Sequence, residues 1–186
     1  MEIKETAEKY RLYTCDEVDS FDDGNRYELI DGKIYLMAPP AYIHQSISSK
    51  LHLQFGNFLK GKTCEVHHAG LAVYLNKNDN NRLEPDISVI CDKSKISDRG
   101  YEGAPTLIIE ILSPSNSSHD KVYKFNKYLE SGVREYWIVD PIDKTVSVNI
   151  LKSGEYFSRY YAKTDTIPVT VLEGCDIDLK GVFPEE

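Results

Sequence analysis

Two runs of apolar, mostly β-branched residues constrain the fold more than any other feature of the sequence. They cover residues 86–90 (Asp-Ile-Ser-Val-Ile) and 107–112 (Leu-Ile-Ile-Glu-Ile-Leu), and such runs are typical of strands that are covered on both faces. A further buried strand is indicated at residues 136–139, and a helix is predicted over residues 119–131. A strand, a helix and a strand in this order favour a parallel crossover. The sequence therefore predicts an α/β fold built on a mixed sheet.

Other segments place one helix before the central strands and hairpins on both sides of them. Residues 27–37 predict a hairpin, because Asp-Gly separates two apolar runs. Residues 43–60 predict a helix, 64–75 strands, and 145–161 with 167–172 antiparallel hairpins. The apolar faces expected for the two helices consist of Ile47, Leu51, Phe55 and Phe58 in the first, and Val122, Phe125 and Leu129 in the second, which should end at Gly132.

The length of 186 residues favours a single domain. We expect residues 1–25 to form an N-terminal arm or helix and residues 26–186 to form the domain. With 22 basic and 30 acidic residues, the net charge is −8. This acidity excludes a generally basic nucleic-acid coat protein, because non-specific affinity for DNA scales with the number of Lys and Arg contacts to phosphate. An enzyme that touches nucleic acid over a small patch is still compatible with it.

The four cysteines, Cys15, Cys64, Cys91 and Cys175, contain no CxxC pair, so a zinc site is not expected. We predict reduced thiols in a cytoplasmic protein. The N-terminal residues lack the apolar core of a signal peptide, and no apolar run approaches the length of a membrane span.

Residues 56–63 match the P-loop pattern G-x-x-x-x-G-K-[ST]. A phosphate-binding loop requires a strand before it and a helix after it. Here the predicted helix comes first and the strand second. The pattern therefore indicates a helix C-terminus with a glycine and a lysine, not a nucleotide site.

Carboxylates inside apolar strands are the stronger chemical signal. Asp86 opens the first central run and Glu110 lies within the second, where a carboxylate is costly unless it is paired, hydrogen-bonded or bound to a metal. If the two strands are neighbours, both side chains can reach one cation, and oxygen ligands suit Mg²⁺ or Mn²⁺. Lys121, Lys124 and Tyr128 form one stripe of the following helix, either facing these acids or solvated.

The pattern of Pro85-Asp86 followed by Glu110 resembles the PD-(D/E)XK nuclease signature. A longer set of motifs over about residues 26–172 resembles the Uma-type restriction endonuclease family. That set consists of Tyr27-Glu-Leu-Ile-Asp-Gly32, His44, Pro85-Asp86, Glu110-Ile-Leu-Ser-Pro-Ser115, Asp120, Lys124, Tyr128 and Gly132-Val-Arg-Glu-Tyr-Trp-Ile-Val-Asp-Pro141. The resemblance implies a restriction-endonuclease-like core, a mixed β-sheet flanked by helices, and metal-dependent phosphodiester cleavage. Leu112 stands where the E-x-K lysine is expected, and the resemblance implies that Lys124 supplies the amine instead.

On this resemblance we expect Asp86, Glu110 and the Ile111 carbonyl to hold Mg²⁺ or Mn²⁺, with Lys124 acting on the attacking water or the phosphate. Glu28 is a candidate for completing the acidic cluster. His44 is a candidate proton carrier or a hydrogen-bonding residue at the start of a helix. The expected partner is DNA, held weakly through a patch that includes Lys121 and Lys124, with a homodimer as a further option and no membrane.

Two alternatives remain open at this stage. The first is a degenerate member of the nuclease fold that binds nucleic acid or protein, which Leu112 favours. The second is a glycosidase that uses Asp86 and Glu110 as its acid pair, which leaves the lysine stripe without a role.

Overall fold

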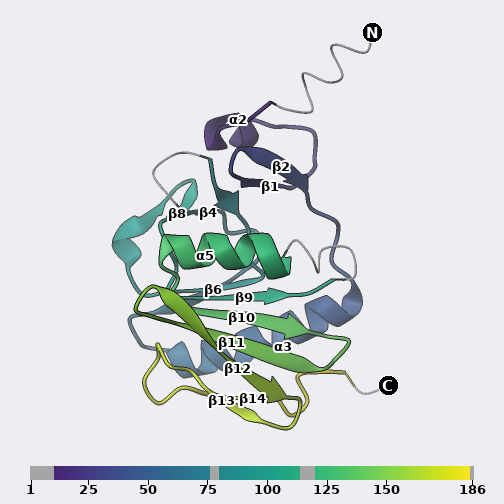
Figure 1. The fold of residues 1–186 in the computed structure, drawn as a ribbon, viewed down its shortest axis with the longest axis vertical. Helices are drawn as coiled ribbons and strands as arrows, with labels where there is room; N and C mark the ends of the chain where they lie inside the picture. Colours follow the sequence, from purple (N-terminus) through teal and green to yellow (C-terminus); the bar gives the residue numbers. More distant parts are fainter. Residues whose placement is uncertain (1–10, 76–79, 114–119, 185–186) are drawn as a thin grey trace.

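The structure is a computed structural model that describes residues 11–75, 80–113 and 120–184, with the side chains of Asp120 and Lys121 also outside the description (Figure 1). A mixed sheet lies at its centre, with strands in the order β12-β11-β10-β9-β6-β3. The bounds of these strands are β3 (Glu65–His68), β6 (Ile87–Ile90), β9 (Leu107–Ile111), β10 (Glu135–Asp140), β11 (Thr145–Lys152) and β12 (Glu155–Ala162).

The two apolar runs that dominate the sequence are neighbouring strands of this sheet. β6 pairs antiparallel with β9, with Ile87 opposite Ile109. β9 pairs parallel with β10, with Ile109 opposite Trp137. The connection between β9 and β10 contains a π-helical turn, η2 (Asp120–Lys124), and the helix α5 (Phe125–Ser131). The predicted parallel crossover and mixed α/β fold are therefore confirmed.

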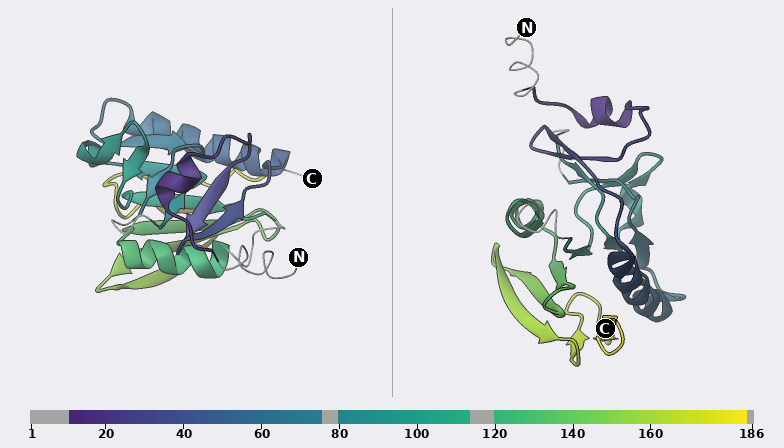
Figure 2. Two further views of the ribbon diagram at one scale, coloured as in Figure 1. Left: turned by 90° about the horizontal axis from the view of Figure 1, so that it is seen from above. Right: turned by 90° about the vertical axis from the view of Figure 1, so that its right-hand side faces the viewer.

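Helices cover both faces of the central sheet (Figure 2). The helix α3 (Tyr42–Leu59) packs Ile47, Leu51 and Phe55 into the larger core, on the face that carries Ile109 and Trp137. α5 lies over the opposite face, where Tyr128 packs with residues such as Ile108 and Tyr136. Alternation of side chains along β9 separates the two cores. Glu110 shares the α5 face with Ile108.

The N-terminal hairpin belongs to a second sheet that the sequence did not reveal. The predicted hairpin is present, and Asp31 and Gly32 adopt the positive φ angles of 50° and 74° that a type I′ turn between its strands requires. Among the described residues the strand order is β2-β1-β5-β4-β8-β7. Their bounds are β1 (Tyr27–Ile30), β2 (Lys33–Leu36), β4 (Val73–Tyr74), β5 (Arg82–Leu83), β7 (Ile96–Ser97) and β8 (Gly100–Glu102). This sheet carries Glu28 toward the centre of the molecule.

Three smaller elements complete the described fold. The helix α2 (Cys15–Asp19) lies in the segment predicted as an arm or helix and begins with a capping box between Thr14 and Glu17. The 3₁₀ turn η1 (Lys93–Lys95) precedes β7. A C-terminal hairpin pairs β13 (Thr166–Pro168) with β14 (Asp176–Asp178). In the described part of the chain, no helix is long and apolar enough to cross a membrane.

The helical connection after β9 buries a different face from the predicted one. The prediction that Val122 lies on the buried face is wrong, since this side chain is 56% exposed, whereas Lys124 is 4% and Tyr128 0% exposed. The physical reason is the sheet surface below, where Glu110 requires polar partners. Phe125 keeps a partly buried place at the side of the helix. Gly132, with φ of 83°, ends α5 as expected.

The prediction of four reduced thiols is also wrong, because Cys64 and Cys91 form a disulfide. Glu65 lies opposite Ile90 in the β3–β6 pairing, so the next residues outward, Cys64 and Cys91, are also opposite each other, with Cα atoms 4.0 Å apart. A separation of 27 residues hid this pairing in the sequence. Cys15 and Cys175 are buried free thiols. The P-loop match fails as predicted, since α3 precedes it and β3 follows it.

The disulfide should make a measurable contribution to stability. Closing a loop of this length lowers the entropy of the unfolded chain by an amount worth about 3–4 kcal/mol. The Cys64→Ser/Cys91→Ser variant should therefore lose about that much unfolding free energy in urea, and reductant should destabilise the unmodified protein similarly. Reductant should not affect the double variant. Equal urea midpoints with and without reductant in the unmodified protein would contradict this expectation.

Candidate active site

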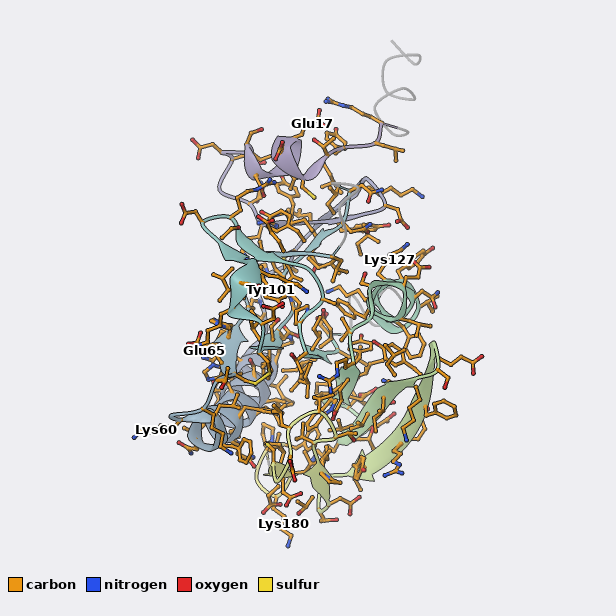
Figure 3. All side chains as sticks on the ribbon, turned by 90° about the vertical axis from the view of Figure 1, so that its left-hand side faces the viewer. Glu17, Lys60, Glu65, Tyr101, Lys127 and Lys180 are labelled. Atoms are coloured by element: carbon orange, nitrogen blue, oxygen red, sulfur yellow. A yellow bond between two sulfur atoms is a disulfide. The ribbon has the colours of Figure 1, made fainter. Side chains whose placement is uncertain are left out.

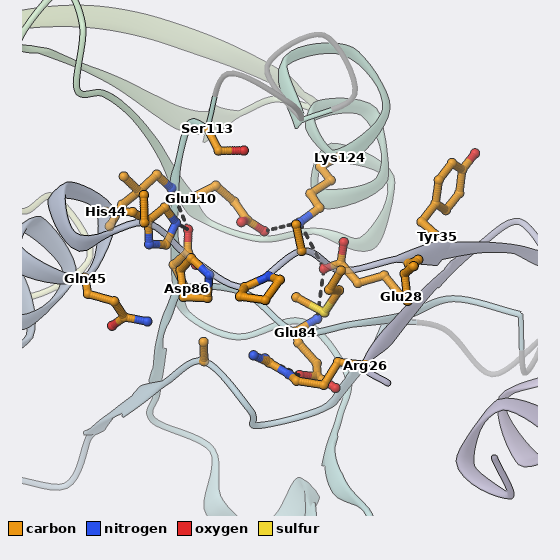
Figure 4. Close-up of a pocket in the computed structure, with 18 of the residues that line it drawn as sticks. Arg26, Glu28, Tyr35, His44, Gln45, Glu84, Asp86, Glu110, Ser113 and Lys124 are labelled. Carbon is orange, nitrogen blue, oxygen red and sulfur yellow. Dashed lines mark hydrogen bonds and ion pairs between the residues drawn. The ribbon is translucent and has the colours of Figure 1, made fainter. Parts of the chain in front are cut away.

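The acidic residues singled out in the sequence meet at one end of the central sheet. Asp86 directly precedes β6, and the register that pairs Ile87 with Ile109 places Asp86 opposite Glu110. A cavity of about 500 Å³ opens there (Figure 4). Its lining includes all the site residues predicted from the sequence: Glu28, His44, Asp86, Glu110, Ile111 and Lys124.

Asp86 is held by both its neighbouring strand and α3. The backbone N–H of Ile111 donates to Asp86 Oδ2 at 2.7 Å, and His44 Nε2 lies 3.0 Å from the same oxygen. His44 lies in the first turn of α3, so the helix start contributes directly to the site. These contacts fix the carboxylate beside the end of β9.

A backbone carbonyl at the end of β9 also lies on the side of the strand that faces Asp86. Leu112 donates its N–H to Val139 of β10 at 2.9 Å, whereas Ile111 donates toward Asp86. Successive residues of a strand direct their backbone groups to opposite sides, and the N–H and C=O of one residue share a side. The Ile111 carbonyl therefore faces the Asp86 side of β9.

Lys124 joins the two remaining acids inside the protein. Its Nζ lies 2.9 Å from Glu28 Oε1 and 3.0 Å from Glu110 Oε1. All three side chains are buried, with at most 7% of each exposed. Each therefore depends on the others, since a buried charge without a partner costs several kcal/mol. The contact between Glu28 and Lys124 spans 96 residues of sequence.

Tyr128 is a site residue that the sequence reading left without a role. One helical turn after Lys124, its O–H donates to Glu110 Oε1 at 2.6 Å. Burial, followed by the charge of Glu110, holds the pKa of this phenol well above its ordinary value of 10.0. Tyr128 therefore remains a hydrogen-bond donor to Glu110 across the physiological pH range. In the sequence, the indication of this position was that Tyr128 follows Lys124 by four residues, which places both on one face of a helix.

Glu84 is a second residue whose position the sequence did not reveal. Its backbone N–H donates to Glu28 Oε1 at 3.1 Å. Its buried carboxylate accepts from Arg26 Nε at 2.9 Å and lies 3.0 Å from Arg82 Nη1. Glu84 thereby links β1 to the segment that carries Asp86. In the sequence, the only indication that Glu84 lies near the site is the Pro85-Asp86 motif that follows it.

The departure from the E-x-K pattern is visible in the structure. Leu112 is buried at the end of β9, so this strand offers no amine at that position. The ammonium group that contacts Glu110 comes from η2 instead. The side chain of Lys121, the other lysine of the predicted stripe, lies outside the described residues.

The donor chemistry of the cavity fits a hard cation. Asp86, Glu110 and the Ile111 carbonyl offer oxygen atoms, which suit Mg²⁺ or Mn²⁺. Over residues 11–75, 80–113 and 120–184, no group of three or more His, Cys, Asp or Glu side chains is close enough to hold a metal. Mg²⁺ does not need such a cage, because it commonly binds one or two carboxylates and completes its shell with water and substrate phosphate.

Comparisons with known proteins agree with this architecture. A solved structure described as a putative nuclease belonging to DUF820, from Anabaena variabilis, matches with a TM-score of 0.74 at 24% identity. The match covers 91% of this chain and 97% of that chain. At this level of identity the likeness shows a shared fold.

A curated relative and a family model extend the comparison to sequence. An uncharacterised protein of Synechocystis is 32% identical over 114 residues, which is 61% of this chain, and the match spans 60% of that relative's length. The family model for Uma2, described as "Putative restriction endonuclease", matches residues 7–180. The match includes nearly the whole chain and every site residue discussed above, so the protein belongs to the Uma2 family of putative restriction endonucleases.

Proposed function

We propose that this protein is a metal-dependent endonuclease that hydrolyses phosphodiester bonds of DNA. The observation that carries the proposal is the convergence of Asp86, Glu110 and Lys124 in one cavity. A pair of carboxylates beside an ammonium group, at the end of a sheet in this family's fold, suits hydrolysis of a phosphate ester. Family membership supports nuclease activity, and the choice of metal and of DNA is our inference.

Asp86, Glu110 and the Ile111 carbonyl would hold Mg²⁺ or Mn²⁺. A bound cation would lower the pKa of a coordinated water and neutralise charge on the scissile phosphate. Other residues of this chain orient the two carboxylates. Ile111 N–H and His44 orient Asp86, and Tyr128 orients Glu110.

Lys124 has the role of the missing E-x-K lysine in this proposal. Its ammonium group would orient the attacking water or stabilise negative charge that develops on the phosphate. Glu28, which accepts a hydrogen bond from the same Nζ atom, would position the amine. His44 would hold Asp86 and carry a proton at Nε2.

A second candidate function is a non-catalytic binding module with the same fold. Leu112 favours it, because the strand position that bears lysine in the wider nuclease motif is apolar here. The two functions differ in one measurable property, since only the first requires cleavage that depends on Asp86 and a divalent cation.

Cleavage of single- and double-stranded DNA with Mg²⁺ or Mn²⁺ tests the proposal. Asp86→Asn keeps the size of the side chain and should lower the cleavage rate by about 10²–10³-fold, the usual effect of removing one electrostatic contact to a transition state. Lys124→Met should lower it similarly. It also leaves Glu28 and Glu110 without their buried cation, at a cost of about 3–5 kcal/mol in stability, so folding is checked by circular dichroism.

Lys127→Met is the matched control, because Lys127 lies one helical turn after Lys124 but pairs with Asp31 and Glu130 and does not line the cavity. It should cleave DNA at the unmodified rate. Absence of cleavage by the unmodified protein with both metals, or equal rates in Asp86→Asn, would reject the endonuclease and leave the binding module.

Tyr128→Phe separates the orientation of Glu110 from the chemistry of Lys124. Below pH 10 the variant should be less stable by about 1–3 kcal/mol, because Glu110 loses a buried hydrogen bond. Above pH 10 the tyrosine ionises in the unfolded chain but not in the folded one, whose pKa is raised. The unmodified protein should therefore lose up to about 1.4 kcal/mol per pH unit from this group, and its advantage over Tyr128→Phe should shrink. Urea unfolding at pH 7 to 11 measures this, and a constant difference over that range would contradict it.

A further inference from the structure

A second cavity, of about 560 Å³, collects positive charge on this acidic protein. Lys144, Lys163 and Lys180 line it, together with residues that include Thr164 and Gly181. Among the described residues that line it, none is acidic. In a chain with a net charge of −8, three lysines around one cavity make this part of the surface locally positive.

Two lysines of this cavity, Lys163 and Lys180, differ from the basic side chains in and beside the candidate active site. Arg26 pairs with Glu84, Lys124 with Glu28 and Glu110, and Lys127 with Asp31 and Glu130. Within the described part of the chain, neither Lys163 nor Lys180 forms an ion pair. Both side chains are exposed. Their charge is therefore available to a ligand.

Nearby acids bind backbone groups rather than these ammonium groups. Asp165 accepts from the backbone N–H of Ala162 at 2.8 Å, and Asp178 accepts from the backbone N–H of Lys180 at 2.9 Å. The segment that carries Lys180 is also held by α3, since Gln54 Oε1 accepts from Asp178 N–H at 2.9 Å and Gln54 Nε2 donates to the Asp178 carbonyl at 2.9 Å. The cavity is thus built on anchored backbone.

The cavity and the candidate active site lie at the same end of the central sheet. β9 and β10 are parallel and end at Ile111 and Asp140, while antiparallel β11 begins at Thr145 and β12 ends at Ala162. Lys144 directly precedes β11 and Lys163 directly follows β12, and two to three strand spacings of about 4.8 Å separate β9 from these two strands, or about 10–14 Å. This corresponds to about three or four base pairs of DNA, which rise about 3.4 Å each.

We propose that this lysine cavity binds a backbone phosphate of the DNA whose scissile phosphate occupies the catalytic cavity. The inference rests on the proposed function and adds to it a second contact on the substrate. The lysine cavity takes the place of the DNA-binding patch expected around Lys124, because Lys124 is buried and already bound to two carboxylates. Lysine ammonium groups are common phosphate ligands, and two or three such contacts provide weak, salt-dependent affinity.

Binding without divalent metal tests the cavity independently of cleavage. Fluorescence anisotropy with a labelled 20-base-pair DNA, in EDTA, gives Kd over a series of NaCl concentrations. In Lys163→Gln/Lys180→Gln the slope of log Kd against log salt should fall by about 0.9, the value for the loss of the one phosphate that the cavity is proposed to bind. Lys60→Gln/Lys152→Gln is the control with the same change in charge. Lys152 ends β11 at the opposite end of the sheet, and Lys60 projects from a different part of the surface than Lys180 (Figure 3).

Equal slopes for both double variants would overturn the proposal. Inorganic phosphate at constant ionic strength provides a second arm. If it shifts the amide resonances of Thr164 and Gly181 while DNA does not, the cavity holds a free anion and the proposal also fails. The two proposals fail separately. A reduced slope without any metal-dependent cleavage keeps the cavity contact and rejects the endonuclease, whereas cleavage with unchanged slopes does the reverse.

Discussion

The buried contact of Lys124 with Glu28 and Glu110 is the interaction on which the rest of the structure depends. Glu28 belongs to the N-terminal sheet, Glu110 to the central sheet and Lys124 to the helical crossover. One ammonium group therefore connects three parts of the fold. Because none of the three charges is tolerated alone in the interior, the positions of both sheets and of the crossover are coupled. Tyr128 adds a neutral donor to the same cluster.

This arrangement also changes how the acidity of the protein relates to DNA. The carboxylates of the cavity are held by Lys124, His44 and backbone amides, so their charge is partly compensated where phosphate would bind. The cation nearest to the reaction is buried and gives no broad attractive surface. If the proposed function holds, attraction for the DNA backbone comes from elsewhere, and the cavity lined by Lys163 and Lys180 offers such charge among the described residues. A local contact of this kind is compatible with a net charge of −8.

Much of the fold could be predicted because its signals are local. The Asp31-Gly32 turn, the face of α3 with Ile47 and Leu51, and the order of strand, helix and strand all follow from short-range patterns. The membership of the N-terminal hairpin in a second sheet did not follow, since its partners β4 and β5 are only two residues long. The buried face of the crossover was predicted wrongly because periodicity counts apolar residues, whereas this face meets Glu110 and is polar.

By itself, the sequence determined the chemistry of the site: two carboxylates at the ends of central strands, a lysine stripe after them, and a leucine where a lysine is expected. Only the tertiary structure decided the partners. It placed Lys124 between Glu28 and Glu110, joined Cys64 to Cys91, and gathered Lys163 and Lys180 at one cavity. The physical reason is that turn propensity and periodicity act over a few residues, whereas charge pairing and disulfide formation depend on proximity between residues far apart in the chain.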